Sequence, residues 1–400
     1  MKIILLGHPA FFGSHSMDRF AAMIVDGMRA RGHQADLWTP AAVMWRLPAR
    51  GGLRKWLGYI DQYILFPMLA LWRLRKVDKD TLLVLADHAL GIWMPLLRHR
   101  PHVVHCHDFI ALRTLAGEFP EHGLSPSGHT YQSLIRWGLL QGKAFIAVSN
   151  KTMRDLRRLH PCAPEAAWVV YNGMNYPFHR MGTTEALACL QRAGVPADPQ
   201  GMLVHIGGNQ WYKNREGVLA LYLAYCRQCL QCREPRALWM IGGDPTAQMR
   251  EQGERAAALG GSVRFLAGLP TEAVQAAYSL AAVMLFPSLE EGFGWPIIEA
   301  MACGAPVLTT NRAPMTEIGG NQVQLLEPMA SGDMDGWALR GAQALAGMLA
   351  WPQARRAEVA ARSIAWAKNF STEKAIDQYE RIYLGVLAAA SVQDHVSVDA

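Results

Sequence analysis

The sequence predicts an α/β protein made of two doubly wound domains. Short apolar runs typical of buried parallel strands alternate with helical patterns along the whole chain. The chain has 400 residues, more than an ordinary single domain, and its 51% hydrophobic content is ample for two cores. We expect the domain boundary between Phe178 and Leu203, because residues 194–201 form a linker rich in proline and glycine.

Individual elements support this prediction in chain order. Residues 81–85 predict a strand, and we interpret the preceding Asp78-Lys79-Asp80 as a turn and not as a metal-binding motif. Residues 183–190 predict a helix near the boundary. Residues 282–286 predict a strand buried on both faces, and residues 306–310 predict the next strand.

Between these last two strands lie a glycine-containing loop and a short helix. Pro296 suits the first helical turn, and Gly304 suits the left-handed residue that ends a helix. Ligands collect at the carboxyl ends of parallel strands, where glycine amides and a helix start favour phosphate. Glu291 in the loop and Glu299 on the helix can accept hydrogen bonds from hydroxyl groups. The segment therefore predicts a site for a ligand with both phosphate and hydroxyls. The alternative is that the glycines form an ordinary turn and Glu299 is a solvated or capping helix residue.

This combination closely resembles the signature of glycosyltransferase family 4, a family of sugar-nucleotide enzymes. The resemblance implies the GT-B fold, in which two Rossmann-like domains face each other across a cleft and a C-terminal helix crosses back to the N-terminal domain. It assigns residues 1–180, with a helix at about 371–390, to an acceptor-binding domain, and residues 195–370 to a domain that binds the nucleotide-sugar donor. The match extends over about the whole chain, through residues 1–7, 103–108, 145–152, 169–175, 203–208, 213–214, 238–243 and 263–268.

The resemblance also implies roles for single residues. Lys213 would neutralise the donor diphosphate, Glu299 would bind the ribose, and Glu291 would hold the donor-sugar hydroxyls. The family commonly places an arginine beside this lysine, where the present chain has Tyr212, and Arg215 or Asn209 are the candidates to compensate. The expected catalytic residues are Lys213, Glu291 and His107, and the expected donor-binding residues are Gly13, Gly208, Asn209, Lys213, Glu291, Gly292, Phe293, Gly294 and Glu299.

Four polar residues follow predicted strands of the first domain and are candidates for acceptor contact. They are Asp87, His88, His107 and Asp108. A histidine at such a position can donate to a sugar hydroxyl or a phosphate near neutral pH. The alternative for His107 and Asp108 is a structural pair that caps the core.

The reaction implied by the resemblance is transfer of a hexose from a nucleotide diphosphate sugar to an acceptor hydroxyl with retention of configuration. We expect it in bacterial cell-surface glycan or glycolipid synthesis, with no cofactor and no metal. One alternative is a catalytically silent GT-B subunit that binds a partner or membrane, to which the departure at Tyr212 points. Another is a nicotinamide-dependent oxidoreductase, which is disfavoured because residues 7–13 lack the dinucleotide glycine spacing.

Charge and cysteine content bear on partners and location. The first 200 residues hold 23 Lys and Arg against 14 Asp and Glu. Basic and aromatic residues of the segment 45–76 surround the apolar run 63–72, which predicts either peripheral contact with anionic membrane or a core helix. No nucleic-acid motif accompanies this charge, and no secretory signal is visible. The seven cysteines, an odd number, favour a cytoplasmic enzyme, with Cys226, Cys229 and Cys232 as inert helix thiols.

Overall fold

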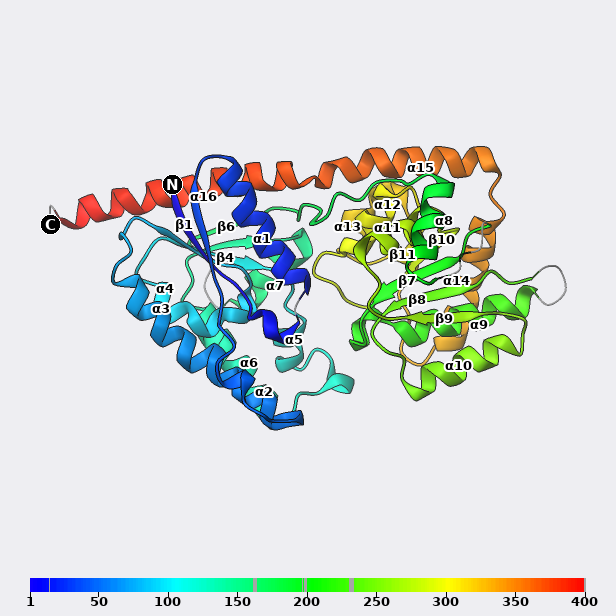
Figure 1. The fold of residues 1–400 in the computed structure, drawn as a ribbon, viewed down its shortest axis with the longest axis horizontal. Helices are drawn as coiled ribbons and strands as arrows, with labels where there is room; N and C mark the ends of the chain where they lie inside the picture. The colour runs from blue at the N-terminus through cyan, green and yellow to red at the C-terminus, as the bar shows by residue number, and fades with distance from the viewer. Residues whose placement is uncertain (14, 161–163, 196, 198–199, 230–233, 399–400) are drawn as a thin grey trace. The chain divides into compact units, whose positions relative to one another are not determined.

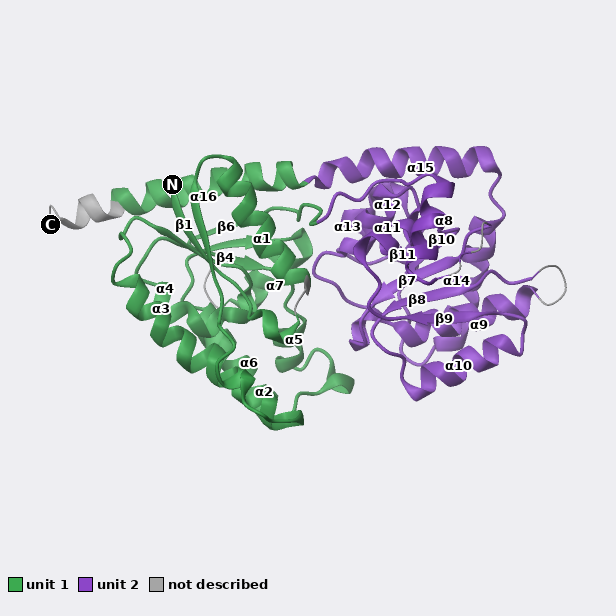
Figure 2. Cartoon of the chain, in the orientation of Figure 1, with its two compact units in different colours: residues 1–175, 372–400 green, residues 176–371 purple. Residues whose placement is uncertain are grey.

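The computed structural model describes residues 1–13, 15–160, 164–195, 197, 200–229 and 234–398. The chain forms two compact units, coloured separately in Figure 2. Unit 1 consists of Met1–Asn175 and Thr372–Ala400, and unit 2 of Tyr176–Ser371. Each unit is a doubly wound α/β domain, as predicted.

Unit 1 contains a six-stranded parallel sheet in the order β2-β1-β3-β4-β5-β6. All four residues of β3, a continuous apolar run, are buried, and all five of β4 are buried as well, His102 and His105 included. The strands are β1 (Lys2–Leu6), β2 (Gln34–Trp38), β3 (Leu82–Leu85), β4 (His102–Cys106), β5 (Ala144–Ala147) and β6 (Ala166–Val169). The main helices are α1 (His15–Ala30), α2 (Gly51–Ile60), α3 (Phe66–Leu74), α4 (Met94–Leu97), α5 (Ile110–Leu115), α6 (Pro126–Leu139), α7 (Asn150–Leu159) and α16 (Thr372–Val398).

The C-terminal helix belongs to unit 1, as the predicted fold requires (Figure 2). Helix α16 packs against α1 and β4. The Tyr383 hydroxyl lies 2.7 Å from Nε2 of His105, a buried residue of β4, and His33 Nε2 lies 2.6 Å from a carboxylate oxygen of Glu380. The helix continues to Val398, whereas we expected it to end at about residue 390.

Unit 2 contains a second six-stranded parallel sheet, in the order β12-β11-β10-β7-β8-β9. Strands β7 to β11 of this sheet are labelled in Figure 1. Its strands are β7 (Leu203–Gly207), β8 (Leu238–Gly242), β9 (Val263–Leu266), β10 (Val283–Phe286), β11 (Val307–Thr310) and β12 (Gln324–Leu326). Its helices are α8 (Thr183–Arg192), α9 (Arg215–Cys229), α10 (Ala247–Ala257), α11 (Thr271–Leu280), α12 (Trp295–Ala302), α13 (Met315–Gly319), α14 (Met334–Leu349) and α15 (Gln353–Ala367). Close approach of β7 and β8 requires Gly242, where a side-chain carbon would lie 2.1 Å from the carbonyl oxygen of Gly207.

The segment 45–76 has two different faces. Helices α2 and α3 are joined by a π-helical turn, Asp61–Leu65. Phe66 and Ala70 of α3 are buried, whereas Met68 is 65% exposed and Trp72 54% exposed. The interpretation as a core helix therefore holds for one face only.

Smaller expectations have mixed outcomes. Asp78-Lys79-Asp80 forms a turn, closed by a hydrogen bond from the Thr81 amide to the Asp78 carbonyl. Cys226 and Cys229 are buried in α9, as expected for inert helix thiols, while Cys232 lies outside the described residues. Strands β2 and β12, at two sheet edges, had no prediction because their short sequences are mostly polar or too brief for a periodic signal.

Candidate functional site

The glycine loop and the helix after β10 have the predicted conformation. Gly294 has φ 100°, which only glycine adopts readily, and it is the N-cap of α12. Pro296 occupies the first turn, and Gly304 has φ 78° just after the helix. The Ile297 amide donates to the carbonyl of Gly294 at 3.0 Å, which closes the first turn of α12.

Lys213 and Glu291 form an ion pair within unit 2. The Lys213 Nζ atom lies 2.7 Å from Oε1 of Glu291, and their side chains are 19% and 7% exposed. The same ammonium lies 5.5 Å from the ring centre of Phe286, the last residue of β10. Sequence positions 78 residues apart therefore meet, and the structure brings two of the three predicted catalytic residues together.

Backbone and amide contacts hold the lysine loop against the glutamate loop. The amide of Leu289 donates to the carbonyl of Tyr212 at 2.8 Å. Asn214, in the left-handed conformation with φ 53°, donates from Nδ2 to the carbonyl of Pro287 at 2.9 Å. Because both loops are fixed in this way, the ammonium of Lys213 and the carboxylate of Glu291 have little freedom to separate.

Arg215 lies beside this pair of loops and is almost fully buried. Its guanidinium donates to Oδ1 of Asn209 and, at 2.8 Å, to the carbonyl of Gly243. Asn209 in turn donates to the carbonyl of Asp244 at 2.8 Å. The Nε and Nη2 atoms of Arg215 are buried and have no hydrogen-bond partner among the described residues. Burial lowers the pKa of Arg215, and its unsatisfied donors are the kind of group that an anionic ligand satisfies.

Glu299 is held within the protein and is not solvated. It is 8% exposed, and the hydroxyl of Tyr278, from α11, donates to its Oε2 at 3.1 Å. The alternative interpretation of Glu299 as a solvated helix residue is therefore wrong. Tyr278 was missed from the sequence because it lies on another helix, 21 positions away.

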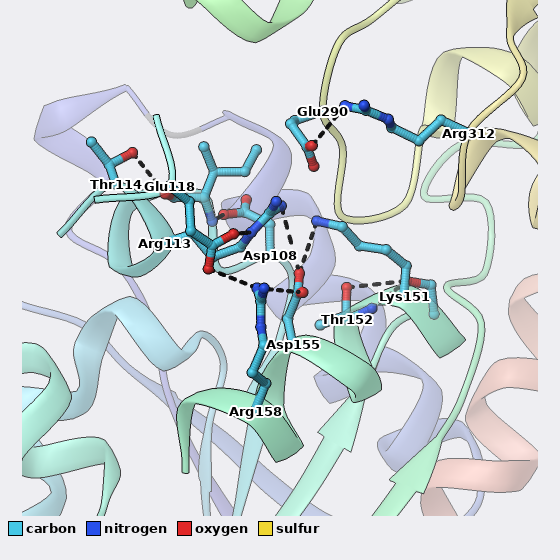
Figure 3. A network of polar contacts seen from close by, with 12 residues as sticks. Asp108, Arg113, Thr114, Glu118, Lys151, Thr152, Asp155, Arg158, Glu290 and Arg312 are labelled. Atoms are coloured by element: carbon cyan, nitrogen blue, oxygen red, sulfur yellow. Dashed lines mark hydrogen bonds and ion pairs between the residues drawn. The ribbon is translucent and has the colours of Figure 1, made fainter. Parts of the chain in front are cut away.

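Two further residues support the site and were not predicted. His205 of β7 donates from Nδ1 to the carbonyl of Leu285 on β10 at 2.9 Å, since a carbonyl can only accept. Burial lowers the pKa of His205 to about 4, so the ring is neutral at physiological pH. Arg312 donates to the carbonyl of Leu289 at 3.0 Å. It also donates to Oε1 of Glu290 at 3.0 Å (Figure 3). The pair fixes the residue next to Glu291.

In unit 1, two histidines clamp Asp87 at the carboxyl ends of β1 and β3. His8 Nε2 lies 2.9 Å from Oδ2 of Asp87, and His88 Nδ1 lies 2.8 Å from Oδ1. Burial alone would raise the pKa of Asp87, but the charge of His88 and hydrogen bonds from both histidines hold it well below its usual range. Burial opposes protonation of His88, yet Asp87 raises the His88 pKa overall. Asp87 and His88 were predicted, whereas His8 was missed.

The other predicted unit 1 residues make contacts within the fold. His107 is buried and its Nε2 donates to the carbonyl of Ala86 at 2.9 Å. Asp108 accepts from the amide of Ile110 at 3.0 Å at the start of α5. Gly13 has φ 73° and ends a short 3-10 helix, Ala10–Phe12, while the neighbouring Ser14 lies outside the described residues.

A network of charged residues connects α5 and α7 in unit 1 (Figure 3). Asp155 forms an ion pair with Lys151 at 2.9 Å, accepts a hydrogen bond from Arg158 at 3.1 Å, and lies 3.8 Å from Arg113. Glu118 joins Arg113 and Arg158 at 2.8 and 2.9 Å. The spacing of Lys151 and Asp155 by four residues on a helix is a signal that could have revealed part of this network. The network therefore ties α5 and the segment after it to α7.

Neither a metal-binding cluster nor a membrane-spanning helix occurs among the described residues. In those parts of the chain, no three His, Cys, Asp or Glu side chains are grouped so that they could hold a metal ion. Among the described helices, none combines the length and apolar character needed to cross a bilayer.

Two family models match the chain, one in each half. The model described as "Glycosyltransferase Family 4" matches residues 17–176, and the model described as "Glycosyl transferases group 1" matches residues 201–340. Together they include Lys213, Glu291 and Glu299 as well as the unit 1 candidates from Asp87 to Asp108.

Curated relatives agree with these models. O-antigen chain mannosyltransferase B of Escherichia coli is 31% identical over 226 residues, 52% of this chain and 55% of the relative. A D-inositol 3-phosphate glycosyltransferase of Segniliparus rotundus is 25% identical over 300 residues, 73% of this chain and 62% of the relative. The chain thus spans a little over half the length of these curated relatives.

Solved structures share the fold over nearly the whole chain. Sucrose-phosphate synthase of Thermosynechococcus elongatus superposes with a TM-score of 0.70 at 20% identity, covering 97% of this chain and all of that one. Anabaena HepE, solved with UDP and glucose, superposes with a TM-score of 0.68 at 18% identity, covering 96% and 100%. At these identities the likeness concerns the fold, which is the GT-B fold predicted from the sequence.

Proposed function

We propose, since the chain belongs to glycosyltransferase family 4, that it transfers a hexose from a nucleotide diphosphate sugar to an acceptor hydroxyl. The observation that carries the proposal is the pairing of Lys213 with Glu291 at 2.7 Å, beside the first turn of α12. This arrangement supplies a cation and the positive end of a helix dipole for a diphosphate next to a carboxylate for sugar hydroxyls.

Lys213 acts on the leaving group in the proposed reaction. An ammonium has three donors, so Lys213 can remain bonded to Glu291 and still donate to phosphate oxygens. Negative charge grows on the diphosphate as the glycosidic bond breaks, and a cation already in position stabilises that charge without reorganisation. The unsatisfied Nε and Nη2 atoms of Arg215 provide two further donors and take the place of the arginine that Tyr212 replaces.

The carboxylates of Glu291 and Glu299 bind the hydroxyl groups of the donor in this proposal. Glu291 accepts from the donor sugar, and Glu299 accepts from the ribose with its remaining lone pairs while Tyr278 holds it in place. Backbone amides of Gly292, Phe293 and Gly294 contribute to binding of the sugar and phosphates. Gly208 and Asn209, which follow β7, lie on the same loop as Lys213 and complete the donor site.

Transfer proceeds with retention and without a metal in this proposal. A donor phosphate oxygen takes the acceptor proton on the face from which the leaving group departs, so no protein base is needed. Protein cations carry the charge that a divalent ion carries in metal-dependent enzymes.

The acceptor binds to unit 1 in this proposal. Asp87, His88, His107 and Asp108 follow β3 and β4, and the clamped Asp87 keeps the rings of His8 and His88 oriented. Gly13 follows β1 at the same edge of the sheet and is assigned to the donor diphosphate. The mannosyltransferase among the relatives makes mannose the first donor sugar to test and a cell-surface glycan the first acceptor class.

We also propose peripheral contact with the anionic surface of a membrane from the cytoplasmic side. The exposed apolar residues of α2 and α3 support this, because Leu53, Trp56, Met68 and Trp72 are each more than half exposed. Arg54 and Lys55 of α2 lie among them and favour anionic lipid.

The experiment for the transferase proposal is a donor screen with the purified chain. Hydrolysis and transfer are measured for uridine, guanosine and adenosine diphosphate sugars, mannose among them. We expect turnover of one nucleotide class and its loss in Lys213→Ala. A folded chain that binds and hydrolyses none of these donors would instead be a silent GT-B subunit.

A further inference from the structure

Unit 1 contains a large cavity that the proposed transfer reaction does not use. Its volume is about 1080 Å³, enough for a ligand of the size of a phosphorylated head group. It lies at the amino ends of β4, β5 and β6, and helix α16 forms part of its wall.

The cavity is distinct from the proposed acceptor site. His102 begins β4 at the cavity, whereas His107 and Asp108 follow the other end of the same strand. At about 3.3 Å per residue, the five residues of β4 separate the two sites by about 15 Å. A ligand in the cavity therefore contacts none of the residues assigned to sugar transfer.

The lining is strongly basic. It contains five Lys and Arg side chains and a single acid, Glu165, which lies 3.3 Å from Lys143. Arg100 is used by the fold, because its guanidinium donates to the carbonyls of Leu74, Val77 and Asp78. By contrast, the described part of the chain offers no ion-pair partner to Arg75 or Lys79, and both are exposed. These two cations are available to an anion.

Helix α16 leaves the space open. Its contribution to the wall consists of Gly385, Val386, Ala389 and Ala390, all with small side chains. A side-chain carbon added at Gly385 would meet no atom within 4 Å. The small side chains on this face of α16 therefore leave the cavity open on that side.

An exposed apolar row on α3 leads to the cavity. Met68, Leu71 and Trp72 are 65%, 50% and 54% exposed, and helical spacing places Arg75 on the same row. The ammonium of Lys76 lies 4.4 Å from the ring centre of Trp72. An aromatic and aliphatic row that ends in cations is typical of a surface lying at the level of lipid phosphates.

We propose that the cavity binds the phosphate of an anionic lipid head group while the outer row of α3 enters the interfacial layer of the bilayer. The inference rests on the proposed membrane contact and adds a defined head-group site to it. Arg75 and Lys79 pair with the phosphate, and Arg98 and Lys143 add positive potential around it. Charge complementarity favours anionic lipid over neutral lipid or a protein partner.

The test compares two double variants that remove equal charge. Arg75→Ala with Lys79→Ala alters the cavity, and Arg19→Ala with Arg136→Ala removes two exposed arginines of unit 1 that do not line it. Co-sedimentation is measured with vesicles of phosphatidylcholine alone and of phosphatidylcholine mixed with phosphatidylglycerol. At about fivefold per cation near the surface, the cavity variant should bind anionic vesicles about 25-fold more weakly. The control variant should change binding about twofold at most, by loss of long-range attraction alone.

A second variant fills the cavity without changing its charge. Gly385→Phe should weaken binding to anionic vesicles at least severalfold and leave thermal unfolding close to that of the wild type. Equal weakening by the cavity and control double variants, with no effect of Gly385→Phe, would leave the membrane contact in place and overturn the head-group site.

Two further outcomes decide the source of the phosphate and the premise. Saturable binding of glycerol phosphate in solution, with vesicle binding unchanged in the cavity variants, would assign the cavity to a soluble ligand and refute the lipid assignment. Wild-type protein that binds neither vesicle would refute both the membrane contact and this inference. Donor turnover, measured in solution, is independent of either result.

Discussion

Replacement of Lys213 by alanine tests the central assignment most directly. An ammonium about 4 Å from a unit charge contributes about 4 kcal/mol at an effective dielectric constant of about 20. The diphosphate is already charged when the donor binds, so only the additional charge that develops in the transition state counts toward the rate. We therefore expect Lys213→Ala to lower kcat by about 100- to 1000-fold, as for loss of one preorganised donor.

The same substitution leaves Glu291 without its partner. An exposed ion pair contributes at most about 1 kcal/mol, and breaking a fully buried one costs about 3 to 5 kcal/mol. The side chains of Lys213 and Glu291 are 19% and 7% exposed, which is an intermediate case. We expect Lys213→Ala to lower the free energy of unfolding by about 2 kcal/mol, between those two limits.

A double variant separates stability from catalysis. Glu291→Gln removes the unpaired charge, so Lys213→Ala combined with Glu291→Gln should recover most of the lost stability. It should recover none of the lost turnover, because the ammonium is still absent. Stability is measured by denaturant unfolding, and turnover by steady-state donor hydrolysis and transfer over a range of donor concentrations. If turnover returns together with stability in the double variant, Lys213 has only a structural role and the reasoning is refuted.

Three other predictions concern separate features. Tyr278→Phe removes the hydrogen bond to Glu299, and a hydrogen bond to a charged group contributes about 1.5 to 3 kcal/mol. The variant should therefore raise the donor KM about tenfold or more, with little change in kcat. An unchanged KM would exclude Glu299 from donor binding. The pKa of Asp87 is lowered in the fold, so Asp87 stabilises the folded state above its ordinary pKa of 3.8, and this stabilisation is lost as pH falls. The pKa of His88 is raised, so His88 stabilises the folded state below its ordinary pKa of 6.5, and this stabilisation is lost as pH rises. Asp87→Asn should therefore cost most stability between about pH 4 and 6.5 in denaturant unfolding, and a pH-independent loss would contradict the clamp. Donor turnover should persist in excess EDTA and gain little from added Mg²⁺, whereas loss of activity on chelation would show that a metal is required.

Much of the fold follows from the sequence because its strands are buried on both faces. A strand such as Leu82–Leu85 must be continuously apolar, and that pattern is visible without knowledge of its neighbours. The segment after β10 could also be predicted from the sequence, because Gly294 and Gly304 adopt backbone conformations that other residues rarely adopt. The interpretation of α3 as a core helix is confirmed for its buried face only, because an apolar helix shows no periodicity from which its exposed face could be predicted.

The partners of the site residues could not be predicted, because they are brought together only by the sheet. Arg215 shows this most clearly. Its sequence position suggested only that it could compensate for Tyr212, but its burial, its bonds to Asn209 and Gly243 and its two unsatisfied donors depend on the packing of β7 against β8. A buried guanidinium with open donors is costly in the unliganded protein, and an anion that satisfies those donors lowers that cost on binding. In the proposed site the second phosphate-binding cation is therefore Arg215, three positions after Tyr212, while the backbone carbonyl of Tyr212 ties the lysine loop to the glutamate loop.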